Sequence, residues 1–90
     1  MDEDRQVLRA EKARRLLEDE TLKDAFAAIK QRYLNHIIGS ELSQVDRREQ
    51  AFKLMKAIDE LHAQLNSWVN EGKVIEDRRK LRKQYAPATV

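Results

Sequence analysis

The sequence contains no cysteine, one proline and two glycines among its 90 residues. The lack of cysteine excludes disulfides, thiolate metal sites and cysteine nucleophiles. So few turn-forming residues disfavour an all-β sandwich or barrel. Charged residues of both signs make up 38% of the chain, and the common residues are helix formers, a composition typical of long helices and coiled coils. We therefore expect one all-α domain over residues 1–90.

Long apolar runs are also missing. The longest covers residues 25–29, which is far shorter than the roughly 18 residues that a membrane span needs. The first five residues are mostly charged and have no apolar stretch behind them, unlike a secretory signal. We expect a cytoplasmic protein that does not bind membranes.

The clearest periodic pattern predicts a helix over about residues 47–70. Asp46 and Glu49 have the spacing of a capping box at its start, and Gly72 is expected to end it in the left-handed conformation. Apolar residues recur at spacings of four and three along this segment, which predicts one wide apolar face. They are Leu54, Ile58, Leu61, Leu65 and Trp68.

A second helix is expected over about residues 20–38, with Asp19 or Thr21 as its cap and Gly39 at its end. Because the loop between the two helices is short, they should form an antiparallel hairpin. We expect Ile58 and Leu65 to be the most buried side chains of the longer helix. The side chains expected to face them are Leu22, Phe26, Ile29 and Tyr33.

Helices are expected to flank the hairpin core, which spans residues 19–72. An N-terminal helix over residues 1–18 can either run straight into the second helix or end at a bend near residues 18–20. We favour the bend, because three successive acids suit a helix N-terminus better than an interior. A basic C-terminal helix is predicted over residues 73–85, and residues 86–90 should be frayed.

Catalytic and metal sites are not indicated. His36 and His62 lie on different helices, and a metal site needs three or four convergent ligands. The sequence has no nucleophile motif and no glycine-rich phosphate loop, and a small hairpin offers hardly any cleft. We expect no enzymatic activity, no cofactor and no small-molecule substrate.

The basic C-terminal segment gives the strongest functional signal. Its cations can simply be solvated at a helix end, contact phosphates of nucleic acid without sequence specificity, or dock on an acidic protein surface. The candidate contact residues are Lys73, Arg78, Arg79, Lys80, Arg82 and Lys83.

The apolar faces of the two central helices are broader than one helix pair can cover. An isolated helix pair is rarely stable in water, so the N-terminal helix, another copy or a protein partner must supply a third surface. Trp68 either caps the core or anchors an interface. The candidate interface residues are Trp68, Val69, Leu61 and Leu54.

Residues 14–26 contain R-R-L-L-E-D-E-T-L followed by Ala25-Phe26, and a polar loop, Asp46 to Glu49, the Leu54–Leu65 stripe and Gly72 come after them. Over about residues 10–75 this order resembles small helical proteins of the head-assembly region of tailed phages and prophages. The resemblance implies a virion or assembly component, in the host cytoplasm or the virion, that binds portal, capsid or packaging proteins. The alternative is a small nucleic-acid-binding accessory protein that uses the basic C-terminal helix.

Overall fold

The computed structural model describes residues 2–85 and arranges them as three helices. α1 spans Glu3–Glu18, α2 spans Glu20–Ile38 and α3 spans Val45–Tyr85. No strand occurs in this part of the chain, so the all-α class is confirmed. The expected frayed segment, residues 86–90, lies outside the described residues.

Asp19 is the single non-helical residue between α1 and α2. Its backbone is extended, at φ −68° and ψ 120°. Its N–H donates to the carbonyl oxygen of Leu16 at 3.2 Å, and its carboxylate accepts from the N–H of Leu22 at 2.8 Å. Asp19 therefore ends one helix and caps the next, and the bend expected near residues 18–20 is confirmed.

The loop between α2 and α3 is held by side-chain hydrogen bonds. The hydroxyl of Ser40 donates to the carbonyl oxygen of Ile37 at 2.7 Å. The guanidinium of Arg48 reaches back from α3 and donates to the carbonyl oxygens of Glu41 and Leu42. These bonds satisfy carbonyl groups that a short loop leaves without helical partners.

The start of α3 differs from the predicted capping box. The N–H of Arg48 donates to the carbonyl oxygen of Gln44, which makes Gln44 the residue before the first turn. Asp46 lies inside that turn, where its charge still suits the positive end of the helix dipole. The prediction of Asp46 as the N-cap is therefore wrong.

Gly72 does not end a helix. It lies within α3, no glycine of the described residues has positive φ, and the helix continues to Tyr85. A Cβ atom at Gly72 would come within 2.2 Å of the Cβ of Ala10 on α1. The glycine therefore permits close helix contact, and the segment predicted as a separate C-terminal helix is the last part of α3.

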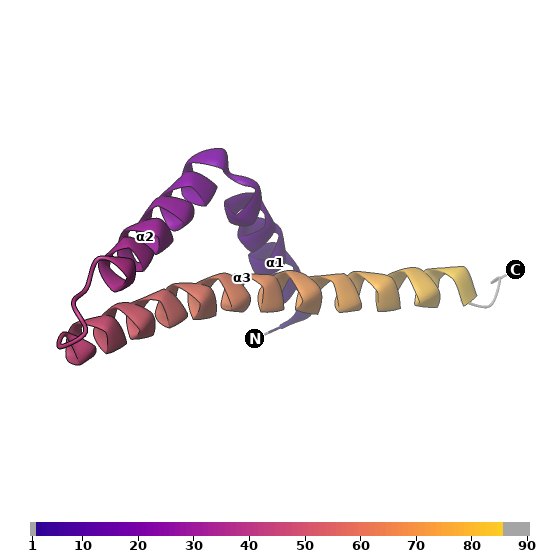
Figure 1. The fold of residues 1–90 in the computed structure, drawn as a ribbon. Helices are drawn as coiled ribbons and strands as arrows, with labels where there is room; N and C mark the ends of the chain where they lie inside the picture. Colours follow the sequence, from indigo (N-terminus) through magenta and orange to yellow (C-terminus); the bar gives the residue numbers. More distant parts are fainter. Residues whose placement is uncertain (1, 86–90) are drawn as a thin grey trace, which may run out of the picture.

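α1 and α2 both run in the direction opposite to α3 and contact successive stretches of it, but both are inclined to α3 and rise from it to the bend that joins them (Figure 1). Ala10 meets Gly72, and Phe26 meets His62 edge to face. Between these two contacts the chain advances 16 residues along α1 and α2 but only 10 along α3. The surplus length is taken up by the bend at Asp19, which stands away from α3 in Figure 1.

The helical hairpin is therefore confirmed only in part. Its α2–α3 portion is antiparallel as expected, but α1 packs on the stretch of α3 beyond it and does not cover the hairpin itself. The molecule extends 77 × 23 × 19 Å with a radius of gyration of 20.2 Å, against about 12 Å for a compact domain of this length.

The buried core is small. It consists of Ala10, Ala13, Ala51, Leu65 and Ile75 together with Gly72. Leu65 is buried as predicted, whereas Ile58 is only half-buried. The reason is a hollow of about 220 Å³ that Ile58 lines together with Phe26 and His62, which leaves the ring pair incompletely covered.

Candidate protein-binding surface

The contact between α1 and α3 combines small residues with ion pairs. Ala10 of α1 lies against Gly72 of α3, and both are buried, as are Ala13 on α1 and Ile75 on α3. Small side chains allow two helix backbones to approach closely, and this close approach buries the contact without large apolar residues.

Arg9 and Trp68 form the centre of this contact. The Arg9 guanidinium carbon lies 4.6 Å from the centroid of the Trp68 ring, a cation–π arrangement. The same guanidinium donates to Glu71 at 2.9 Å, while Arg9 Nε is buried without a hydrogen-bond partner. Trp68 and its neighbour Val69 are half-buried, so α1 covers part of this predicted interface within one chain.

The basic segment is partly neutralised by the acidic start of α1. Arg79 donates to Asp4 at 2.8 Å, and this hydrogen bond is the main cause of the raised pKa of Arg79. Arg78 lies 3.6 Å from a carboxylate oxygen of Glu3. These two predicted contact residues therefore help to hold α1 on α3.

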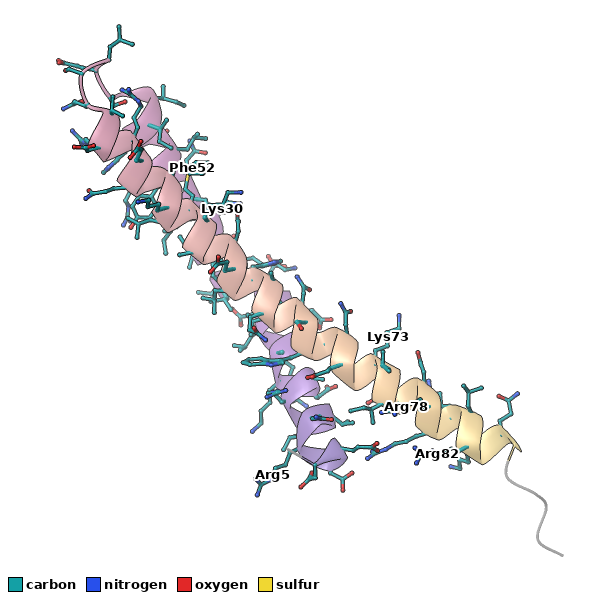
Figure 2. The ribbon with its side chains drawn as sticks, turned by 90° about the horizontal axis from the view of Figure 1, so that it is seen from below. Arg5, Lys30, Phe52, Lys73, Arg78 and Arg82 are labelled. Atoms are coloured by element: carbon teal, nitrogen blue, oxygen red, sulfur yellow. The ribbon has the colours of Figure 1, made fainter. Side chains whose placement is uncertain are left out.

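The other four candidate cations have no ion pair within the described part of the chain. We call them the cationic end of α3, and all four are exposed. Figure 2 shows Lys73, Arg78 and Arg82 following one another along this end of the rod. The cationic end consists of Lys73, Lys80, Arg82 and Lys83.

Large apolar side chains are exposed at many places on the rod, and sequence reasoning identified only two of them as interface residues. Their exposed fractions run from 38% to 93%. The periodic pattern indicated a buried face but could not show how little of it α1 and α2 cover. The set comprises Leu8, Leu16, Leu34, Ile38, Leu42, Val45, Phe52, Leu54, Leu61, Val74 and Leu81.

Four of these side chains lie on the last turns of α2 and the first turns of α3, on either side of the loop, and we call them the loop-end patch. Leu34 and Ile38 lie one turn apart on α2, while Val45 and Phe52 lie two turns apart on α3. Phe52 and Ile37 line a shallow hollow of about 300 Å³ together with the charged residues Arg48, Glu49 and Lys53. An exposed apolar cluster of this kind is characteristic of a protein-binding site.

Leu54 and Leu61 lie on α3 but line neither this hollow nor the one at His62. Both are exposed, at 46% and 53%. Of the four predicted interface residues, these two are therefore exposed, whereas Trp68 and Val69 are half-buried.

The histidines take part in local contacts. The Nδ1 atom of His62 lies 3.2 Å from the amide nitrogen of Asn66, and the His36 ring meets Tyr33 edge to face. Among the described residues, no group of three or more potential ligands is arranged to hold a metal ion. Nor does any helix there combine the length and hydrophobicity of a membrane span.

A single ion pair joins α2 to α3 within residues 2–85. The Lys30 ammonium lies 2.9 Å from a carboxylate oxygen of Asp59. Its hydrogen bond to Asp59 is the main reason that the pKa of this carboxyl is lower than usual. The pair crosses the hairpin at about the middle of α2.

Comparison with models of protein families, with curated proteins and with solved structures gives no match for this chain.

Proposed function

We propose that this protein is a non-enzymatic component that acts by helix-mediated binding to other proteins. The observation that carries the proposal is the number of large apolar side chains exposed on the rod, set against a core of five small or medium ones. Exposing them has an unfavourable hydration free energy of about 25 cal/mol per Å². Covering them with a protein partner removes that cost, and the loop-end patch offers the most concentrated site.

The resemblance to phage head-assembly proteins narrows this proposal to a virion or assembly component. Such a component binds portal, capsid or packaging proteins through its helical faces. The elongated shape supports this role, because a rod of 77 Å presents separate surfaces to separate neighbours.

The test is the mass of the protein in solution, measured alone and together with the products of neighbouring genes. We expect a complex heavier than the 10.6 kDa chain, and we expect Phe52→Ser or Ile38→Ser to weaken it. Leu81→Ser is the matched control, since Leu81 is also exposed but lies far from the loop. A monomer under every condition would reject the proposal.

A further inference from the structure

Leu54, Ala57 and Leu61 form an exposed stripe along α3, which we call the α3 stripe. Residues seven apart lie above one another on a helix, so the two leucines line up with the alanine between them. The neighbouring stripe toward α2 holds Ala51 and Leu65, which are only 4% and 7% exposed. Around the circumference of α3, the exposed α3 stripe is thus next to the buried side of the helix.

Lys53 and Glu60 each come directly before a leucine of this stripe, and both are exposed. In heptad terms the leucines occupy a positions and the two charged residues occupy g positions. Two antiparallel helices bring g residues of one against g residues of the other. Lys53 of one copy then faces Glu60 of a second copy, and the same pair forms again across the two-fold axis.

A parallel pair of the same helices does not give this match. It places g residues opposite e positions, which here are Ile58 and Leu65 and are turned toward α2 in their own chain. The charge pattern is therefore self-complementary in the antiparallel direction only.

We propose that the α3 stripe binds a second copy of this chain, antiparallel and about a two-fold axis. This rests on the proposed protein-binding function and adds a second surface to it, separate from the loop-end patch. The axis passes between residues 55 and 56. Leu54 of each copy then packs beside Ala57 of the other, and the small alanine lets the two helices approach closely.

The surface area of the chain is consistent with such a dimer. The accessible surface is 7380 Å², whereas a compact monomer of 10.6 kDa exposes about 5,500 Å². The excess of about 1,900 Å² per chain is more than the ~800 Å² that each partner buries in a standard protein–protein interface. Closed two-fold dimers are also the commonest assembly of identical subunits.

Charge reversal on the full chain tests the pairing. We expect K53E or E60K alone to raise the dimer dissociation constant roughly tenfold, because each change converts two attractive contacts into repulsive ones. The double variant K53E/E60K should return close to the parent value. K80E, which changes the same charge at the far end of α3, should dimerise like the parent. The measurement is sedimentation equilibrium, with helicity by circular dichroism to show that each variant is folded.

Cross-linking tests the direction. The chain has no cysteine, so A57C and Q84C each introduce one reactive site, to be treated with a short bismaleimide. In the antiparallel dimer the two copies of A57C lie near the axis and cross-link. The two copies of Q84C are about 85 Å apart at 1.5 Å per residue and do not. Cross-linking of both variants indicates a parallel pair and overturns the proposal.

Two further results overturn it. One is a monomer at concentrations on the order of 100 μM, where even weak specific dimers form, and the other is a dimer whose affinity the double charge reversal does not restore. If the chain alone is a monomer but forms a complex with a different protein, this inference fails while the proposed protein-binding function stands. If neither association occurs, both fail.

Discussion

Gly72 shows how closely α1 and α3 approach each other. Alanine is favoured over glycine within a helix by ~1 kcal/mol, yet Gly72→Ala places a methyl group 2.2 Å from the Cβ of Ala10. Overpacking of this kind costs ~1–3 kcal/mol, so we expect a net loss of up to about 2 kcal/mol in the free energy of unfolding.

Urea denaturation measures this effect, and Asn70→Ala on the exposed face of α3 serves as the control. Adding Ala10→Gly to Gly72→Ala should recover much of the loss, since the two methyl groups compete for one space. A Gly72→Ala variant more stable than the parent by ~1 kcal/mol, the gain in helix propensity alone, would mean that the helices separate without cost.

Asp19 and Asp46 form a matched pair for a test of helix capping. Asp19→Ala should lower the free energy of unfolding by ~1 kcal/mol, because the N–H of Leu22 loses its acceptor. Asp46→Ala removes only a favourable charge in the first turn, for which a few tenths of a kcal/mol is the expected effect. Chemical denaturation of both variants gives the comparison, and a larger loss at Asp46 would contradict the assignment of the caps.

At the scale of the elements, the ion pair between α2 and α3 makes stability depend on pH. The lowered pKa of Asp59 means that its ionised form is favoured by folding. This contribution is fully present above the usual carboxyl value of 3.8 and is lost as the pH falls through the lowered pKa. The difference in stability between the parent and Asp59→Asn should therefore shrink as the solution is acidified.

Lys30→Met provides the control for that titration. Without the ammonium group the carboxyl of Asp59 loses its hydrogen-bond donor. In the Lys30→Met background, the pH-dependent part of the effect of Asp59→Asn should therefore nearly vanish. Thermal melts from strongly acidic to neutral pH measure it. An unchanged effect would assign the pH dependence to other groups.

The basic residues in the last turns of α3 fall into two groups, one expected to bind DNA and the other to hold α1 in place. Any affinity for duplex DNA should come from Lys80, Arg82 and Lys83, which have no ion pair within residues 2–85. Replacing these three with glutamine should weaken DNA binding and flatten its salt dependence while leaving the melting temperature unchanged. Replacing Arg78 and Arg79 should instead lower the melting temperature, because the acidic start of α1 loses its partners. Fluorescence anisotropy over a salt series makes the comparison.

Local sequence signals predicted both ends of α2 correctly. Asp19 offered a cap and Gly39-Ser40 a stop, and both act within a few residues of their own position. Gly72 was misinterpreted because a glycine permits either a helix end or a close contact, and only the distant Ala10 decides between them. Likewise, the stripe of Leu54 and Leu61 was visible in the sequence, but its exposure depends on where α1 and α2 lie.

At the scale of the whole molecule, the thermal stability of the rod should depend on protein concentration. A second copy that covers the α3 stripe binds only the folded chain, so mass action raises the melting temperature with concentration. Leu54→Asn with Leu61→Asn should abolish this dependence, whereas Val74→Asn with Leu81→Asn should leave it intact. Calorimetry across a hundredfold range of concentration measures it, and a constant melting temperature for the parent would contradict self-association.

The contact between the first and last helices also determines the order in which the molecule folds during synthesis. α1 leaves the ribosome well before its partners on α3, from Trp68 to Arg79, are translated. α2 can pair with the first turns of α3 earlier, since the loop that joins them is short. α1 is thus made before α2 but docks after it, and the nascent chain carries Ala10 and Ala13, which are buried in the folded molecule, uncovered until the stretch of α3 from Trp68 to Arg79 has been made.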